Sequence, residues 1–284
     1  MTPTLVRQHL PHAGAKPRVD LRARARDWSE IQERMLVPLY EAVYERLEVG
    51  PATRLLGLGC GSGLSLLMAA ARGAAVTGVD VSPERMTLAR ERLLPGTPGT
   101  RARPDIRLVE GTPRDTALPG APGYSLVTAF EPIGCLAGDS EGLGGLLAEA
   151  APLARRGAAV VLAGWGPPER CATASVMRVA TKLAEPLRHT GSWRPARRDD
   201  LEDVAQRAGL EPDGSGRVAC PFGYADVDSA VRGLKSTGLF DAAMTATDQA
   251  QVDKELTEAL HPHQRQDGTV WMPNVFRYLI ARTP

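Results

Sequence analysis

The apolar residues of the chain follow two different periods through its first 165 positions. Between Asp27 and Leu47 they recur every three or four residues, which predicts a helix with one buried face. From residue 54 onward, short apolar runs alternate with segments of helical period and with turn residues. The runs predict strands at Leu55–Leu58, Ala75–Asp80, Ile106–Val109 and Ser125–Phe130, with a fifth strand in RRGAAVVLAGW. Ser82-Pro83 predicts an N-cap with proline at the first helical position, which opens a helix to about Leu94. This alternation of strands and helices predicts an α/β fold with a doubly wound, mostly parallel sheet and helices on both faces.

The pattern is less regular after Trp165. Helical periods are found at Ala172–Leu187, Asp199–Ala208, Asp226–Gly233 and Asp248–Leu260. A strand is expected within AGLEPDGSGRVACPF, and a closing strand at Val270–Ala281, where Pro273 predicts a bend or an edge position. We expect a flexible leader at residues 1–26 and a single domain at 27–284. Its core is predicted at 50–165, and its elaborations at 166–265.

The composition is that of an ordinary globular protein, with 43% hydrophobic and 24% charged residues. A net charge of +1 gives no reason to expect a nucleic-acid or membrane partner. No apolar run approaches the length of a membrane span, the N-terminus lacks a signal-peptide core, and the cysteines form no C-x-x-C pair. We therefore expect a cytoplasmic protein without a metal site. Its few lysines among many arginines are typical of a high-GC bacterial genome.

Four glycines lie within seven residues of RLLGLGCGSGLSLL (residues 54–67), between a predicted strand and a predicted helix. A glycine-rich turn at this place lets a nucleotide approach the backbone and the helix N-terminus. The dinucleotide pattern G-x-G-x-x-G needs a third glycine, but Ser62, Leu64 and Leu66 occupy that place in the three registers. The loop is therefore not built for a pyrophosphate, which disfavours a dehydrogenase.

The residues from Leu55 to Gly63 resemble motif I of the class I S-adenosylmethionine-dependent methyltransferases, V-L-D-x-G-C-G-x-G, at every place but one. Asp80 ends the second predicted strand 21 residues after Gly59, where this family has an acid that binds both ribose hydroxyls. Residues 27–165 are thereby similar to this family in its bacterial small-molecule form. The resemblance implies S-adenosylmethionine as the cofactor. It also implies a seven-stranded Rossmann-like sheet whose last strand is antiparallel and lies beside the fifth.

The resemblance assigns cofactor contacts to named residues. In the glycine loop these are Gly59, Cys60, Gly61 and Gly63, and beyond it Val81 and Met86 are implied to contact the adenine. Family members usually have Gly-Asp after the third strand. Here Thr112 stands at that place and Asp115 follows three residues later, so either is a candidate to bind the adenine amino group. Trp28, at the start of the first predicted helix, is a candidate to face the methionine end or to be a core residue.

Gly57 is the one departure from motif I, because the family usually has an acid at this place. Glu131 follows the fourth predicted strand in Phe130-Glu131-Pro132-Ile133, where the family has a residue beside the transferable methyl group. Two roles are open for Glu131: general base for the acceptor, or contact with the methionine amino group in place of the missing acid. The backbone carbonyls of Gly59 and Phe130 are alternative acceptors for that amino group. FEPI also differs from the N-P-P-Y of methyltransferases that act on planar amines.

The histidines and the C-terminal aromatic residues have no single interpretation. His9 and His12 lie in the leader, His189 ends a predicted helix, and His261 and His263 flank Pro262 in a segment able to fold over a pocket. None has metal-ligand spacing. The apolar residues of the C-terminal third either line a substrate cavity or pack helices together: Trp165, Met177, Trp193, Phe222, Tyr224, Phe240 and Met244.

These features predict methyl transfer from S-adenosylmethionine to a small organic molecule, by in-line attack within a closed pocket on the substrate side of the domain. A cyclase or isomerase that keeps the cofactor without transferring its methyl group is the first alternative, since one fold hosts several functions. A non-catalytic cofactor-binding protein is the second. The acceptor atom and the oligomeric state are not encoded in these motifs.

Overall fold

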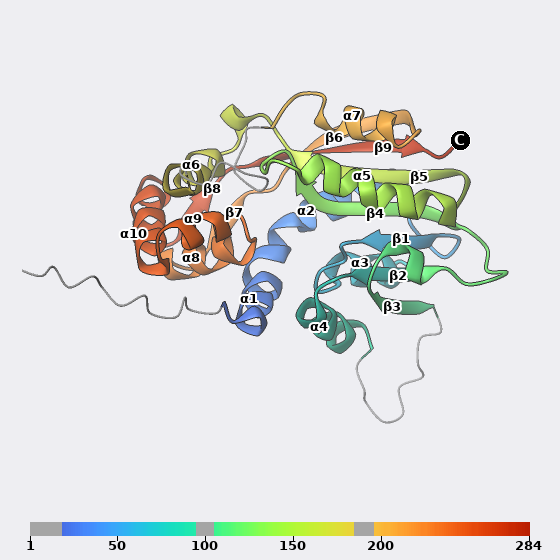
Figure 1. The fold of residues 1–284 in the computed structure, drawn as a ribbon, viewed down its shortest axis with the longest axis horizontal. Coiled ribbons are helices and arrows are strands. Elements are labelled where there is room, and N and C mark those ends of the chain that lie inside the picture. The colour runs from blue at the N-terminus through green and yellow to red at the C-terminus, as the bar shows by residue number, and fades with distance from the viewer. Residues whose placement is uncertain (1–18, 95–104, 185–195) are drawn as a thin grey trace, which may run out of the picture.

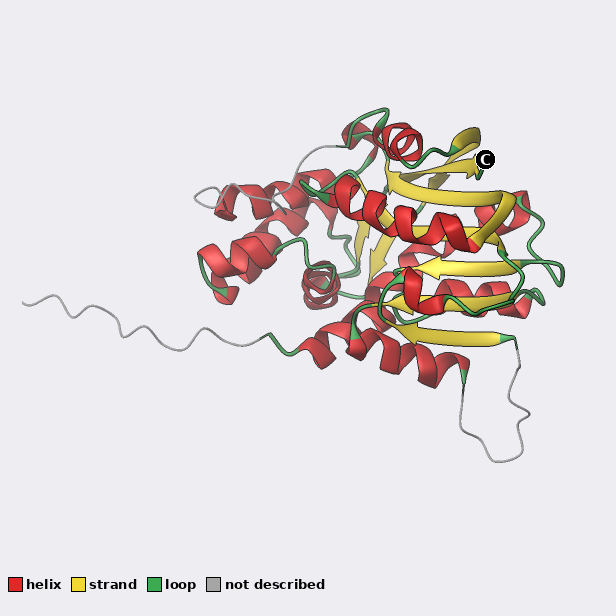
Figure 2. Ribbon diagram, turned by 45° about the vertical axis from the view of Figure 1, so that its right-hand side comes forward, coloured by secondary structure: helices red, strands yellow, loops and turns green. Residues whose placement is uncertain are grey.

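The computed structural model describes residues 19–94, 105–184 and 196–284. At its centre is a seven-stranded sheet whose first five strands in sequence are parallel (Figures 1 and 2). The strand order is β3 (Ile106–Glu110), β2 (Ala75–Asp80), β1 (Arg54–Leu58), β4 (Tyr124–Ile133), β5 (Ala154–Trp165), β9 (Val275–Arg282) and β6 (Glu211–Ala219). The last strand, β9, runs antiparallel to both β5 and β6. The predicted doubly wound sheet with an antiparallel last strand beside the fifth is therefore confirmed.

Helices cover both faces of this sheet, and each face has its own apolar core (Figure 1). On one face lie α2 (Val37–Arg46), α3 (Leu64–Ala71) and α4 (Pro83–Leu93). On the other lie α5 (Asp139–Ala150) and α7 (Asp200–Arg207), where Leu147 and Leu201 are fully buried. Helix α4 begins as its sequence predicts, because the Ser82 side chain accepts a hydrogen bond from Arg85 N and Pro83 needs no amide partner.

The N-terminal helix is not the single regular helix that its apolar period predicts. It consists of α1 (Leu21–Asp27), a π-helical turn (Trp28–Gln32), a 3₁₀ turn (Glu33–Leu36) and then α2. Pro38 lies at the start of α2, where it lacks an amide hydrogen and its ring would clash with the carbonyl four residues earlier. Residues 21–26, which we expected in the flexible leader, are helical and belong to α1. Asp20 caps this helix by accepting from Arg22 N and Ala23 N.

The predicted closing strand is divided in two at Pro273. Strand β8 (Val270–Met272) pairs with β7 (Phe222–Tyr224) in a separate two-stranded sheet, and β9 joins the main sheet. Asn274 holds the bend between them, since its Oδ1 accepts from Thr173 N at 3.1 Å and its Nδ2 donates to Met272 O at 3.2 Å. This bend delivers β7 and β8 toward the carboxyl edge of the main sheet.

A group of four helices lies beside that edge (Figure 1). It consists of α6 (Thr173–Ala184), α8 (Val227–Ser236), α9 (Asp241–Ala246) and α10 (Gln249–Leu260), of which α9 was not predicted from the sequence. Helix α8 packs against α1 and the π-helical turn. Short 3₁₀ turns connect other elements at Pro113–Thr116, Ala151–Leu153, Pro168–Arg170 and His261–His263. The helical group and the N-terminal segment thus lie against the same end of the sheet.

Candidate active site

The glycine loop follows β1 at the carboxyl edge of the parallel strands and leads into α3. Gly59, Gly61 and Gly63 have φ values of +57°, +57° and +81°, which residues other than glycine rarely adopt. Gly63 is the residue directly before α3. The loop therefore turns three times through left-handed backbone and leaves its Cα atoms bare. Such a loop lets a ligand lie directly against the backbone.

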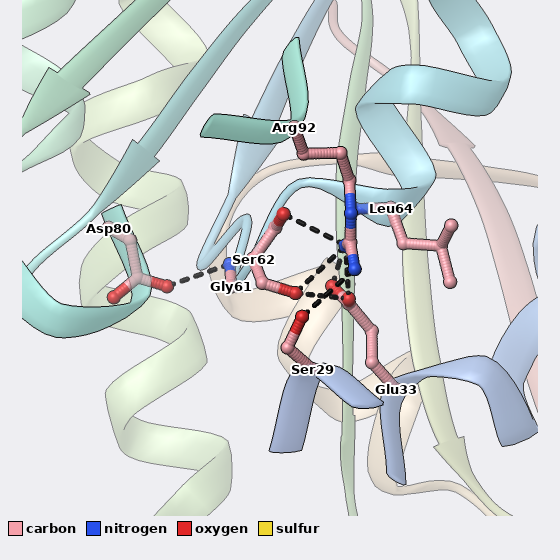
Figure 3. A network of polar contacts seen from close by, with 7 residues as sticks. All are labelled: Ser29, Glu33, Gly61, Ser62, Leu64, Asp80 and Arg92. Atoms are coloured by element: carbon pink, nitrogen blue, oxygen red, sulfur yellow. Dashed lines mark hydrogen bonds and ion pairs between the residues drawn. The ribbon is translucent and has the colours of Figure 1, made fainter. Parts of the chain in front are cut away.

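Asp80 ties the glycine loop to the end of β2. Its Oδ2 accepts a hydrogen bond from Gly61 N at 2.9 Å (Figure 3). Its Oδ1 accepts from Ser82 N at 2.9 Å. The side chain is only 6% exposed. A carboxylate has about four acceptor positions, so two of them are left for a ligand. Asp80 thus shapes the loop as well as offering acceptor oxygens at the end of β2.

Glu33, which the sequence did not suggest, is a buried carboxylate that reaches the same loop from the N-terminal segment. It is 2% exposed, and its Oε2 lies 2.7 Å from Arg92 Nη1 and also accepts from Ser62 Oγ (Figure 3). Arg92 donates further to Ser62 O and to Ser29 Oγ, each at 2.9 Å. The second carboxylate oxygen of Glu33, Oε1, has only a long contact of 3.4 Å with Leu64 N. A buried charge is stable only when it is paired, and Arg92 provides the pairing.

Trp28 lies next to Glu33 above Gly61. Its indole Nε1 is buried and has no hydrogen-bond partner among the described residues. A Cβ placed on Gly61 would lie 3.2 Å from that nitrogen and 3.3 Å from Glu33 Oε1. The guanidinium of Arg85 lies 4.7 Å from the centre of the indole ring. An unpaired buried donor is costly, so this nitrogen points to a ligand.

The missing motif acid has a structural reason in Leu66. A Cβ on Gly57 would lie 2.9 Å from Leu66 Cδ2, and one on Gly78 would lie 2.3 Å from Leu66 Cδ1. Gly57 and Gly78 are paired across β1 and β2, so together they form a slot for this fully buried leucine. An acid at position 57 would therefore collide with Leu66. Glu33 instead brings a carboxylate to the loop from another part of the chain.

The predicted adenine contacts differ in exposure. The Val81 side chain is 71% exposed at the end of β2, which leaves an apolar surface beside Asp80. Met86 has no exposed surface, and its sulfur lies 3.8 Å from the buried Cys60 Sγ. Burial raises the pKa of the Cys60 thiol to about 12, so it stays protonated at neutral pH. Met86 and the Cys60 side chain thus support the loop from below.

Thr112 and Asp115, the two candidates for the adenine amino group, hydrogen bond to each other in one turn. They form the capping box of the 3₁₀ turn Pro113–Thr116, in which Asp115 Oδ2 accepts from Thr112 N at 2.8 Å and from Thr112 Oγ1 at 3.2 Å. Both side chains are exposed. The turn follows β3, and Gly111 N donates to Asp80 O at 3.0 Å. It therefore lies beside the end of β2.

Phe130 and Glu131 lie at the end of β4, and both line the glycine-loop cavity with Trp28, Glu33 and Tyr40. The Phe130 ring is buried and lies 4.8 Å from that of Tyr40, between ring centres. Burial raises the pKa of Tyr40, so its phenol stays protonated. The Glu131 side chain is exposed at this cavity, and its Oε2 lies 3.5 Å from the position of a Cβ on Gly59.

The histidines are not brought to this site by the described part of the structure. His261 and His263 form a 3₁₀ turn after α10, and neither lines the glycine-loop cavity. Burial lowers the pKa of His263, which lies 3.4 Å from Ser175 Oγ. His9, His12 and His189 lie outside the described residues.

The described residues contain neither a metal-binding cluster nor a membrane-spanning helix. Within residues 19–94, 105–184 and 196–284, no three His, Cys, Asp or Glu side chains are grouped so as to hold a metal ion. In the same ranges no helix has both the length and the apolar character needed to cross a membrane. The four cysteines lie within these ranges, are all buried and form no disulfide there.

Comparison with known proteins places this site in context. Residues 55–157 match a family described as a methyltransferase domain. No curated protein matches the chain. Among solved structures, the chain is similar to a proposed methyltransferase from Bacillus halodurans C-125, with a TM-score of 0.53 and 15% identity over 86% of this chain and 98% of that one. At this identity the likeness shows the fold alone.

Two further structures are similar at a TM-score of 0.48 and 16% identity. They are the geranyl diphosphate C-methyltransferase of Streptomyces coelicolor A3(2), covering 89% of this chain and 80% of that one, and the [4+2]-cyclase SpnF, covering 87% and 80%. Likenesses this distant say nothing about chemistry. The match of residues 55–157 supports S-adenosylmethionine-dependent methyl transfer in general, and the chain has the Rossmann-like methyltransferase fold.

Proposed function

We propose that this protein transfers a methyl group from S-adenosylmethionine to a small organic molecule. The observation that carries the proposal is the pair of groups above Gly61. Trp28 Nε1 is a buried donor without a partner in the described residues, and Glu33 Oε1 is a carboxylate oxygen with one long contact. A zwitterion with a carboxylate and an ammonium group satisfies both. The methionine end of the cofactor is such a zwitterion.

The other cofactor contacts follow from the ends of the parallel strands. The acceptor positions left on Asp80 suit the two ribose hydroxyls, and the exposed side chain of Val81 suits the face of the adenine. The capping box of Thr112 and Asp115 then lies toward the adenine edge. Arg85, which stacks on Trp28 and lines the same cavity, adds a positive charge for the carboxylate.

When bound, the cofactor supplies a methyl group already activated on a sulfonium. The chain therefore needs to align the acceptor, exclude water and accept a proton. Phe130 and Tyr40 close the floor of the cavity with apolar rings, which excludes water. Glu131, at the mouth of the cavity, accepts a hydrogen bond from the acceptor and takes its proton.

The proposal is tested by calorimetric titration with S-adenosylhomocysteine, followed by incubation with methyl-labelled S-adenosylmethionine and a metabolite extract of the source cells. We expect binding, formation of S-adenosylhomocysteine and label in the small-molecule fraction. Absence of binding would overturn the proposal. Binding and turnover of an extract component without S-adenosylhomocysteine would instead indicate an enzyme that keeps the methyl group.

A matched pair of variants tests the observation itself. Trp28→Phe keeps the ring but removes the donor, and we expect a loss of about tenfold in affinity for S-adenosylhomocysteine, the size of one hydrogen bond to a charged group. Trp271→Phe makes the same change at an exposed indole outside the cavity, and it should leave the affinity unchanged. Equal affinities for the two variants would contradict the role of Trp28.

A further inference from the structure

A second cavity adjoins the glycine-loop cavity on the side of the C-terminal strands. The two cavities share three residues, Trp28, Leu36 and Glu131. A molecule in the second cavity therefore lies beside the mouth of the first. This is the place from which an acceptor reaches a methyl group held over the glycine loop.

Aromatic rings from three separate strands form the far wall of this second cavity. Trp165 ends β5, Phe222 begins β7 and Phe276 lies in β9. The centre of the Trp165 ring lies 4.6 Å from that of Phe276 and 5.9 Å from that of Phe222. Phe222 and Phe276 are also 5.9 Å apart and nearly parallel. Phe222 and Phe276 are only 2% and 0% exposed, so they support the partly exposed indole of Trp165, whose flat apolar face is the one offered to a ligand.

Charge in this wall is limited to one group. Glu131 is the one ionisable carboxylate among the described lining residues, which include no lysine, arginine or histidine. The polar side chains of Gln32 and Thr237 each make a hydrogen bond to a residue that does not line the cavity. Gln32 Oε1 accepts from Tyr224 OH at 2.9 Å, and Thr237 Oγ1 donates to Leu234 O at 2.6 Å. An anionic group in this cavity would lose its water and gain no cation.

We propose that this cavity binds the methyl acceptor, and that the acceptor is a compact ring-bearing molecule with no anionic group, whose reacting hydroxyl or amine donates a hydrogen bond to Glu131. This inference rests on the proposed function. The acceptor's oxygen or nitrogen forms a bond to the methyl carbon while the carbon–sulfur bond breaks with its electron pair left on sulfur. Glu131 takes the proton that the acceptor loses.

Three probes that share one ring test the inference: 4-fluorophenol, 4-fluorobenzylamine and 4-fluorobenzoate. Their binding is measured by fluorine NMR line broadening, with and without saturating S-adenosylhomocysteine. We expect the phenol and the amine to bind at least tenfold more tightly than the benzoate. Equal or tighter binding of the benzoate, or no binding of any probe, overturns the inference.

Two variants change the charge of the cavity. Thr237→Lys introduces the missing cation, and we expect it to raise the affinity for the benzoate at least tenfold. The same substitution at Thr245, an exposed residue of α9 outside the cavity, is the control and should change nothing. Glu131→Gln should weaken the amine most. A Thr237→Lys protein that is folded but still rejects the benzoate overturns the assignment.

The two proposals fail in different ways. If S-adenosylhomocysteine binds and the probes do not, the acceptor cavity is wrong while the cofactor site stands. If S-adenosylhomocysteine does not bind but the probes keep the expected order of affinity, the cavity selects rings without an anionic group, but the proposed function and the cavity's role as an acceptor site are overturned.

Discussion

The two adjoining cavities are built by different means. The glycine-loop cavity is shaped by backbone hydrogen bonds and buried charges, such as those of Asp80 and Glu33. The aromatic cavity is shaped by the packing of Trp165, Phe222 and Phe276, with little hydrogen bonding. Hydrogen bonds fix positions and directions, whereas apolar packing fixes volume and shape. The first kind of cavity suits one defined ligand, and the second suits the role we propose for it, which is to select the class of acceptor.

The N-terminal segment belongs to both cavities. Trp28 and Leu36 line each of them, and Glu33 lies between these two residues in the sequence. Its backbone changes here from α1 to a π-helical and then a 3₁₀ turn. Such interruptions of a helix are frequent at functional sites. Substitutions in the glycine loop and the N-terminal segment therefore test whether the glycine-loop cavity depends on hydrogen bonds and buried charges, as the comparison with the aromatic cavity implies.

The largest effect is expected for Gly57→Asp, which restores the acid that motif I usually has. The new side chain meets Leu66 Cδ2, which lies 2.9 Å from the position of a Cβ. We expect a loss of about 3 kcal/mol in the free energy of unfolding, from overpacking and an unpaired buried charge. Urea unfolding measures it. In the double variant with Leu66→Ala, the loss in free energy of unfolding should be smaller than the sum of the losses of the two single variants. A double-variant loss equal to that sum would contradict the slot formed by Gly57 and Gly78.

Asp80→Ala should cause the next largest change, on affinity rather than on the fold. It removes the acceptor for Gly61 N and Ser82 N and the oxygens assigned to the ribose. We expect affinity for S-adenosylhomocysteine to fall about 100-fold, the size of one or two charge-assisted hydrogen bonds. Asp248→Ala removes a helix-capping carboxylate far from the site and is the control. A calorimetric affinity equal to that of the wild type would contradict the role given to Asp80.

Gly61→Ala should have a smaller effect, which a second glycine separates into two parts. Gly61 and Gly268 both have left-handed backbone, with φ of +57° and +86°, so alanine at either should lower the free energy of unfolding by about 1 kcal/mol. Only the Gly61 methyl group meets Trp28 Nε1 and Glu33 Oε1, whereas nothing lies within 4 Å at Gly268. Affinity for S-adenosylhomocysteine should therefore fall only in Gly61→Ala. An equal fall in both variants would indicate an effect of backbone strain alone.

The sequence predicted the central sheet well because its signals are local. Strand β2 has the predicted bounds, and α4 has the predicted cap at Ser82 and Pro83. The glycines at 59, 61 and 63 lie in the predicted turn between strand and helix, where the structure gives them left-handed backbone. Each of these features depends on residues within a few positions of one another, so their pattern is visible in one stretch of chain.

Features that depend on distant residues were not predictable in this way. Glu33 reaches Ser62 and Arg92 across 29 and 59 positions, so no short motif marks it. Only its burial beside a helix interruption, once known, identifies it. The apolar residues of the C-terminal third that were candidates to line a substrate cavity fall into two groups in the structure. Trp165 and Phe222 line the cavity, whereas Met177 and Phe240 are buried in the core away from it and Trp193 lies outside the described residues; Phe222 is itself only 2% exposed.

The decisive measurement concerns Glu33 as the replacement for the motif acid. Glu33→Gln keeps the size of the side chain and removes its charge. S-adenosylhomocysteine and 5′-methylthioadenosine are compared as ligands, because the second lacks the amino-acid end. Glu30→Gln, an exposed position of the same segment, is the control.

We expect Glu33→Gln to weaken S-adenosylhomocysteine about tenfold, which is 1.4 kcal/mol, while its affinity for 5′-methylthioadenosine stays at the wild-type value. Glu30→Gln should change neither. Calorimetry on the folded proteins gives both affinities. An equal loss for the two ligands, or no loss for either, would contradict the assignment of Glu33 to the methionine end of the cofactor.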